Sequence, residues 1–292
     1  MSTTTNDNMS KCAACGKGDD GLKTCTACKL VKYCDATCQK AHRPIHKKEC
    51  KKRAAQLHDE ALFKEPPPRG ECPICFLTMP PNEGDVTYKS CCGKMICNGC
   101  IVAACKEDIR QLCPFCRSNT CASIEEYIER LKKRAEGDDA EAMYNLGYKY
   151  CHGKMGLPQD YDKAMEFYLR AGELGCAAAY TNIAYAYSDG KGVERDVKKA
   201  KYYDELAAMG GEPEARHNLG SLENNAGNIT RAVKHWMISA AAGYDDSLKE
   251  IREGFLNVDV TKDDFEKALR AHQASKDEMK SEQREAAARF YG

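Results

Sequence analysis

The chain has little of what builds a large aromatic core, since its 292 residues include only 7 Phe and 1 Trp. No stretch approaches the ~18 consecutive apolar residues of a transmembrane helix, so the sequence predicts no membrane span. The first residues lack a basic segment followed by an apolar one, and we expect no secretory signal there. The chain also has no excess of charge of either sign. The 44 Lys and Arg balance 44 Asp and Glu, so net charge draws the protein to neither nucleic acid nor membrane.

Cysteine is the residue present in excess. Of 19 cysteines, 17 lie at or before Cys121, and only Cys151 and Cys176 follow. Disulfides need an oxidising compartment, to which nothing in the sequence directs the chain, so we expect a cytoplasmic or nuclear protein. Metal binding is then the remaining reason for so many thiols. It divides the chain into a metal-binding N-terminal part and a C-terminal part without a cysteine pattern.

The first group of candidate ligands contains seven cysteines and one histidine in four close pairs. The pairs are Cys12-x2-Cys15, Cys25-x2-Cys28, Cys34-x3-Cys38 and His46-x3-Cys50. Eight such ligands suit two tetrahedral zinc ions better than a disulfide framework or scattered buried thiols. A Cys-x2-Cys turn brings two thiolates to one point, and a helix places residues four apart on one face. Pro44 precedes the last pair, which predicts a first helical turn there.

This spacing, with the steps Tyr33-Cys34 and Cys38-Gln39, resembles the MYND zinc finger over residues 12–50. The resemblance implies interleaved metal sites. One zinc would be held by Cys12, Cys15, Cys34 and Cys38, and the other by Cys25, Cys28, His46 and Cys50. The family usually has a tryptophan where this chain has Arg43, and that aromatic residue helps to line the family's groove for proline-rich peptides. We therefore expect weak binding of such peptides here.

A run of basic residues overlaps the end of this group. It comprises Lys40, Arg43, Lys47, Lys48, Lys51, Lys52 and Arg53. Such a run has the electrostatic footprint of a nucleic-acid surface. The thiolates of the metal sites offset much of its charge, however, so the sequence favours a solvated helix face and makes nucleic acid an unlikely partner.

A second cysteine-rich segment follows a helix and the stiff linker around Pro66-Pro67-Pro68. Its pairs are Cys72-x2-Cys75, Cys91-Cys92, Cys97-x2-Cys100 and Cys113-x2-Cys116. Three Cys-x2-Cys pairs in so short a segment are strong evidence for zinc. The stretches Cys72-Pro73-Ile74-Cys75 and Cys113-Pro114-Phe115-Cys116-Arg117 resemble a RING finger. The resemblance implies one zinc on Cys72, Cys75, Cys97 and Cys100, and another on Cys113, Cys116 and the Cys91/Cys92 region.

The chain departs from the RING pattern where the family has a histidine, because Lys94 stands there. An ammonium has no lone pair to offer a metal. Either Cys91 and Cys92 both bind, which requires a backbone turn that Gly93 permits, or the second site is degenerate. Four zinc ions are therefore expected in the first case and three in the second.

RING fingers that act in ubiquitin transfer grip a conjugating enzyme through an apolar patch and a cation. The matching positions here are Ile74, Pro114 and Arg117, whereas the aromatic residue usual in the helix is replaced by Ala104. The resemblance thus implies partner-binding roles for the first three residues. It assigns no covalent catalyst.

A repeating helical pattern replaces the cysteine pattern after residue 122. Aligned segments begin Ala142-x3-Leu146-Gly147, Ala179-x3-Ile183-Ala184, Ala215-x3-Leu219-Gly220 and Ser247-x3-Ile251-Arg252. A second helix with regularly spaced alanines follows in the first three, and Gly175, Gly211 and Gly243 fit its C-terminal turn. Repeated helix pairs stack as a solenoid. With Gly156-Leu157-x2-Asp160 and Gly192-Val193-x2-Asp196 in equivalent loops, this part resembles Sel-one-like repeats, relatives of TPR.

The sequence therefore predicts a mixed fold in which two small zinc-stabilised modules precede an all-α helical-repeat solenoid. The expected divisions are a disordered N-terminus (1–10), a MYND-type finger (11–50), a helix and Pro-rich linker (51–69), a RING-like finger (70–121), Sel-one-like repeats (122–275) and a C-terminal capping helix (276–292). Three interaction modules in a row favour an adaptor that binds other proteins. The alternative is a ubiquitin-protein ligase that recruits a conjugating enzyme.

Overall fold

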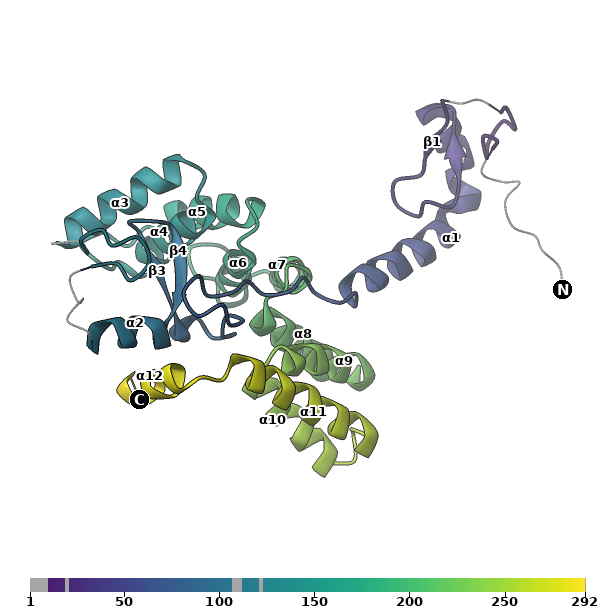
Figure 1. The fold of residues 1–292 in the computed structure, drawn as a ribbon. Coiled ribbons are helices and arrows are strands. Elements are labelled where there is room, and N and C mark those ends of the chain that lie inside the picture. The colour runs from purple at the N-terminus through teal and green to yellow at the C-terminus, as the bar shows by residue number, and fades with distance from the viewer. Residues whose placement is uncertain (1–9, 19–20, 107–111, 121–122, 292) are drawn as a thin grey trace. The chain divides into compact units, whose positions relative to one another are not determined.

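The computed structural model describes residues 10–18, 21–106, 112–120 and 123–291 (Figure 1). The chain divides into two compact units, Met1–Lys64 and Glu65–Gly292. Residues 1–9 of the segment expected to be disordered, and Cys121, lie outside the described residues. Within the described part of the chain, no helix combines the length and the apolar character needed to cross a membrane.

The first unit is a two-stranded hairpin followed by one long helix. Strand β1 (Lys23–Thr24) pairs antiparallel with β2 (Lys32–Tyr33), and α1 spans Ala36–Leu62. The Asp35 carboxylate accepts a hydrogen bond from the amide of Cys38 at 2.8 Å and so caps the helix. The expectation that a helix starts near Pro44 was wrong, because Asp35 supplies an earlier cap and Pro44 lies inside α1. Proline removes only its own N–H from the ladder, and the helix continues on both sides.

The second unit begins with a small hairpin and a helix. After the 3₁₀ turn η2 (Glu83–Asp85), strand β3 (Val86–Lys89) pairs antiparallel with β4 (Lys94–Cys97), and α2 (Asn98–Lys106) follows directly. The turn expected at Gly93 is present, with φ of +68°. This left-handed conformation is one that glycine adopts at no steric cost.

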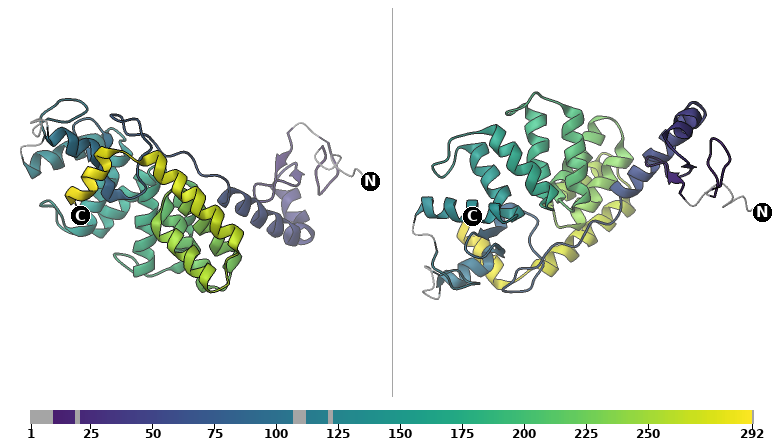
Figure 2. Two further views of the ribbon diagram at one scale, coloured as in Figure 1. Left: turned by 60° about the horizontal axis from the view of Figure 1, so that its bottom comes forward. Right: turned by 90° about the horizontal axis from the view of Figure 1, so that it is seen from above.

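From Ile124 onward the described residues of the second unit form helices joined by short connections (Figures 1 and 2). Its helices are α3 (Ile124–Glu136), α4 (Ala140–His152), α5 (Tyr161–Glu173), α6 (Ala177–Asp189), α7 (Val197–Met209), α8 (Pro213–Asn225), α9 (Ile229–Ala241), α10 (Asp245–Leu256), α11 (Lys262–Met279) and α12 (Glu282–Tyr291). The carboxylates of Asp139, Asp160 and Asp196 cap α4, α5 and α7. The predicted fold class, cysteine-rich zinc modules followed by a helical-repeat solenoid, is confirmed.

In two of the helix pairs, α4–α5 and α8–α9, an aromatic side chain of the second helix packs against a glycine of the first. A Cβ added at Gly147 would lie 2.8 Å from the Tyr168 ring, and one added at Gly220 would lie 2.4 Å from Nε1 of Trp236. Both glycines therefore make room for a large ring. In the second repeat, the position of that ring holds Asp204, which is only 5% exposed. The core of the solenoid thus contains a carboxylate where its neighbours have aromatic rings.

Asp204→Asn is expected to stabilise the solenoid at pH 8. Burial raises the pKa of Asp204 from 3.8 to about 7. Because this folded-state pKa lies above the unfolded one, ionisation destabilises the fold above pH 7, and the effect fades as the pH falls and vanishes below 3.8. The gain at pH 8 should be on the order of 2–4 kcal/mol. Thermal unfolding at pH 8 and pH 4 measures it, and an equal gain at both pH values would contradict the assignment.

The segment expected to form a C-terminal cap of the repeats, 276–292, contains the end of α11 and the separate helix α12. Lys280 has extended backbone angles that end α11, and the hydroxyl of Ser281 accepts a hydrogen bond from the amide of Arg284 at 3.2 Å. Helix α12 packs against α2 of the cysteine-rich segment. The chain therefore turns away from the repeats after Met279, because a new cap starts a helix in another direction.

Candidate metal centres

Four groups of four potential metal ligands are found among the described residues, and within each group the ligand atoms lie within 4.8 Å of one another. In the first unit they are Cys12, Cys15, Cys34 and Cys38, and then Cys25, Cys28, His46 and Cys50. In the second unit they are Cys72, Cys75, Cys97 and Cys100, and then Cys91, Cys92, Cys113 and Cys116. All sixteen residues singled out from the sequence are thus placed in these groups, in the interleaved order that the resemblances imply.

Four of the Cys-x2-Cys pairs share one backbone turn. In each, the amide of the residue after the second cysteine donates a hydrogen bond to the carbonyl oxygen of the first cysteine, at 2.9 to 3.0 Å. That residue has a positive φ, and the four are Gly16, Lys29, Phe76 and Arg117. Non-glycine residues rarely adopt this conformation, so the turn is held by its surroundings. The same local geometry built four times points both thiols of each pair to one place.

The spacing of the sulfur atoms fits a tetrahedral zinc ion. Within each group, sulfur atoms that come from different cysteine pairs lie 3.5 to 3.9 Å apart. Zn–S bonds of ~2.3 Å place the corners of a tetrahedron about 3.8 Å apart. Disulfide sulfurs would be only about 2.05 Å apart, so these are not disulfides. Nε2 of His46 lies 3.2 Å from Sγ of Cys28, so a nitrogen ligand joins the sulfur atoms at the second site.

Proton loss is unevenly distributed within the first group. Backbone hydrogen bonding from Cys15 lowers the pKa of Cys12 to about 6. Hydrogen bonding with the Cys12 thiol raises the pKa of Cys38 to about 12, and hydrogen bonding with Cys15 raises the pKa of Cys34 to about 11. One thiolate therefore keeps its neighbours protonated, and four thiolates are stable together only around a cation. The donor set fits zinc, which thiolates bind readily.

The group containing Cys91 and Cys92 is held from outside by a residue that sequence reasoning missed. Arg134 of α3 donates hydrogen bonds to the carbonyl oxygens of Ser90 and Cys91 at 2.6 and 3.0 Å. The same guanidinium lies 3.2 Å from the Asp139 carboxylate, which also accepts a hydrogen bond from the Tyr88 hydroxyl at 2.7 Å. These contacts shape the turn that lets two adjacent cysteines approach one point. Lys94, at the family's histidine position, is exposed.

The three residues suggested to contact a conjugating enzyme lie on the first and last Cys-x2-Cys turns of the cysteine-rich segment, those of Cys72–Cys75 and Cys113–Cys116, called the two outer turns below. Ile74 and Pro114 are partly buried, whereas Arg117 is exposed. Two aromatic side chains that the sequence argument did not single out stand beside them in the chain. Phe76 is 71% exposed and Phe115 is 42% exposed. An exposed phenylalanine next to a zinc knuckle adds apolar surface that water contacts unfavourably.

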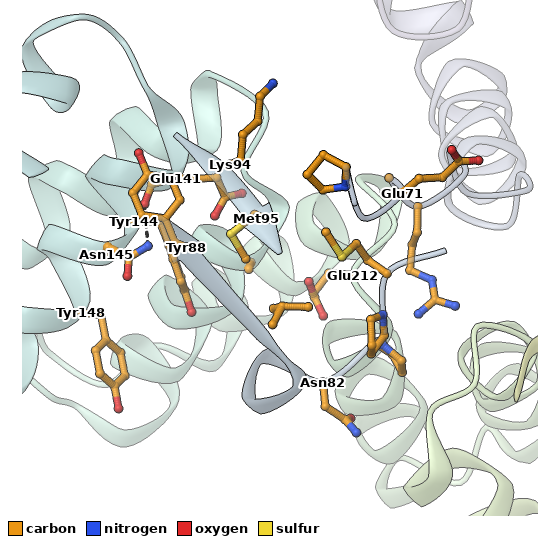
Figure 3. Close-up of a pocket in the computed structure, with 18 of the residues that line it drawn as sticks. Glu71, Asn82, Tyr88, Lys94, Met95, Glu141, Tyr144, Asn145, Tyr148 and Glu212 are labelled. Carbon is orange, nitrogen blue, oxygen red and sulfur yellow. Dashed lines mark hydrogen bonds between the residues drawn. The ribbon is translucent and has the colours of Figure 1, made fainter. Parts of the chain in front are cut away.

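An open pocket of about 620 Å³ lies between the cysteine-rich segment and the first repeats. In the view of Figure 3, Tyr144, Asn145 and Tyr148 of α4 form one side, Glu71 lies across from them, and Met95 lies between. Tyrosine, asparagine and methionine in this lining combine apolar surface with hydrogen-bonding groups.

Comparison with known proteins identifies two of the modules. The family model of the MYND finger matches residues 12–50, and that of the Sel1 repeat matches residues 140–176 and 177–212. The chain therefore contains a MYND finger and Sel1 repeats. Its four cysteine and histidine groups are candidate zinc sites.

Similarity to individual proteins is confined to parts of them. The chain is 30% identical over 112 residues to the ERAD-associated E3 ubiquitin-protein ligase component HRD3B of Arabidopsis thaliana, a match covering 38% of this chain and 17% of that protein. It is 48% identical over 40 residues to histone-lysine N-methyltransferase SMYD3 of Homo sapiens, covering 14% of this chain and 9% of that one. A Sel1 repeat protein from Oxalobacter formigenes aligns with a TM-score of 0.48 at 29% identity, over 53% of this chain and 65% of that chain. The matches span less than a fifth of HRD3B or SMYD3.

Proposed function

We propose that this protein is a zinc-binding adaptor that joins other proteins in the cytoplasm or nucleus. The observation that carries the proposal is the presence in one chain of a MYND finger, a second cysteine-rich module with two candidate zinc sites, and Sel1 repeats. Metal sites hold small surfaces rigid, and helical repeats present an extended face; both suit the binding of proteins.

A row of polar side chains along the first helices of the repeats supports a binding face on the solenoid. Asn145, Asn182 and Asn218 occupy equivalent positions. Nδ2 of Asn182 donates to the Tyr144 hydroxyl and Nδ2 of Asn218 to the Tyr185 hydroxyl, each at 3.3 Å. Side-chain amides both donate to and accept from peptide groups. We therefore expect a client chain to lie along this row, beginning in the pocket that Asn145 lines.

The adaptor proposal is tested with the full chain as bait, followed by crosslinking and mass spectrometry. The variant Asn145→Ala/Asn218→Ala should lose the clients that crosslink to the repeats and retain those that crosslink to residues 12–50. Asn224→Ala, at an exposed position at the end of α8, is the matched control and should retain both sets. If the double variant loses both sets of clients or keeps both, the two binding functions are not separate and the proposal fails.

The second candidate function is that of a ubiquitin-protein ligase, and we propose that the RING-like module recruits a charged conjugating enzyme. Support comes from the position of Ile74 and Pro114 on the two outer turns, from the exposed Phe115, and from the exposed Arg117 directly after the last cysteine. Ala104 opposes it, because a methyl group gives α2 a smaller contact than the aromatic residue usual there. Such a ligase acts by holding the reactants in one orientation, which alone lowers the barrier.

Arg117→Ala should reduce stimulated discharge of ubiquitin from a conjugating enzyme by at least about tenfold, because the guanidinium would hold enzyme and ubiquitin together. Discharge is measured across a broad panel of conjugating enzymes with the zinc-loaded protein. Arg252→Ala changes an exposed arginine on α10 and serves as control. Zinc content should stay the same in both variants, since Arg117 is outside the ligand groups. No stimulation by the unmodified protein with any enzyme would leave only the adaptor function.

Proline-rich peptides are expected to bind the MYND finger weakly or not at all. Arg43 is exposed on α1, at the position where the MYND family usually has a tryptophan that helps to line the groove for such peptides. Calorimetric titration of the full chain should give no measurable heat, and Arg43→Trp should restore binding. Low-micromolar affinity of the unmodified protein would show that another surface replaces the missing ring.

A further inference from the structure

The guanidinium of Arg284, on the last helix of the chain, lies against the candidate zinc site of Cys72, Cys75, Cys97 and Cys100. One of its terminal nitrogens is 3.7 Å from Sγ of Cys75 and donates to the carbonyl oxygen of Leu77 at 3.3 Å. The other donates to the carbonyl oxygens of Thr78 and Met279, at 2.8 and 2.9 Å. A side chain about 200 positions away in sequence thus contacts both a metal ligand and the backbone that follows it.

Close packing between α12 and α2 places this guanidinium. A Cβ added at Gly99 would lie 2.8 Å from both the backbone nitrogen and Cγ of Arg284, so only glycine allows this approach. A second arginine ties the same region together. Arg69 donates hydrogen bonds to the hydroxyl of Ser275 at 3.3 Å and to the sulfur of Met279 at 3.5 Å. The junction of α11 and α12 is therefore fixed to the start of the cysteine-rich segment at two points.

We propose that α12 is an intramolecular brace for the first zinc site of the RING-like segment, and that Arg284 is the positioning residue through which it acts. The inference rests on zinc binding by this group of cysteines and does not depend on ubiquitin transfer.

Charge gives the contact its direction. Four thiolates around one Zn²⁺ carry a net charge of −2, and a permanently charged guanidinium beside them lowers the energy of that state. Hydrogen bonds from such neighbours also fix the orientation of the ligands, and their loss typically weakens a metal site about 10- to 100-fold. Arginine is suited to this position because its planar fork carries donors on separate nitrogens, which reach the sulfur and several carbonyl oxygens at once.

The brace is tested by the rate at which individual cysteines lose their protection. The full-length, zinc-loaded protein is mixed with excess chelator and maleimide, and labelling is followed by peptide mass spectrometry. In Arg284→Ala, Cys72, Cys75, Cys97 and Cys100 should be labelled at least about tenfold faster than in the unmodified protein. The eight ligands between residues 12 and 50 should be labelled at an unchanged rate and serve as the internal reference.

Two further variants separate the brace from a general loss of stability. Gly99→Ala substitutes neither Arg284 nor any ligand and favours the helix α2. Its Cβ would meet the backbone of Arg284 and displace α12, so it should speed labelling of the same four cysteines. Arg289→Ala removes an exposed arginine from α12 and should change nothing.

Labelling of the four cysteines at the unmodified rate in both Arg284→Ala and Gly99→Ala would overturn the proposal. Equal acceleration at all ligands, including those between residues 12 and 50, would overturn it as well. If the cysteines of the unmodified protein are labelled equally fast with and without chelator, that separate result would refute zinc binding itself.

Discussion

Excess zinc chelator should unfold both cysteine-rich segments while helices α4 to α10 stay folded. The buried residues of the first segment are mainly thiols and one tyrosine, Cys12, Cys25, Cys28 and Tyr33, so little apolar surface remains to hold it without metal. Structural zinc supplies on the order of 10–16 kcal/mol to small modules of this kind. The repeats instead bury aliphatic side chains, among them Leu146, Ile183, Leu219 and Ile251, each at 0% exposure.

Hydrogen exchange with mass spectrometry, with and without chelator, measures this difference segment by segment. Peptides between residues 12 and 50 and between 70 and 120 should lose their protection. Those of α4 to α10 should keep theirs, and α12 should lose its protection because its packing partner α2 unfolds. Loss of protection throughout the chain would show that the repeats depend on the zinc modules, and unchanged protection everywhere would show that the metal does not hold them.

Trp236→Ala should destabilise the repeats by about 3–5 kcal/mol, because it removes a large buried ring. Trp236 is 4% exposed and rests against Gly220. Gly220→Ala should also destabilise the repeats, by a net value of about 1–2 kcal/mol, since the clash with the ring outweighs the higher helix propensity of alanine. In the Trp236→Ala background the same Gly220→Ala change should become stabilising by up to about 1 kcal/mol, because the clash is gone.

The change of sign is the decisive feature of this cycle. Thermal unfolding of the zinc-loaded proteins, followed by circular dichroism, gives the four stabilities. Tyr202→Ala removes a ring that is 53% exposed and should alter stability by less than about 0.5 kcal/mol. If Gly220→Ala has the same effect on stability in both backgrounds, the two substitutions are additive, and Gly220 does not serve to accommodate the ring.

Local spacing was enough to predict which cysteines the fold gathers, because a knuckle of four residues and a helical turn are short-range structures. The repeats were also predictable, since alanine and glycine recur at the points where paired helices approach. Gly175, Gly211 and Gly243 have the positive φ expected at helix ends. The start of α1 could not be placed from Pro44, because the helix begins earlier at the Asp35 cap and accommodates proline in its interior.

Contacts between distant segments could not be read from the sequence. Arg134 and Arg284 each reach a cysteine-rich turn from a helix far along the chain, and nothing in their neighbours marks them as different from the other surface arginines. The burial of Asp204 was equally hard to predict. Aspartate is usually exposed, and only the packing of Tyr168 and Trp236 at the equivalent positions shows that this position faces the core. Such pairings depend on three-dimensional packing and require the structure.

The most direct test of the zinc account is the metal stoichiometry of the intact protein, measured by native mass spectrometry. The four groups of ligands predict four Zn²⁺ per chain. Replacement of Cys113 by serine should reduce the number to three, because it removes one ligand of the group that contains Cys91 and Cys92. Two or fewer zinc ions in the unmodified protein would contradict the account, whereas four show that each group holds a metal ion.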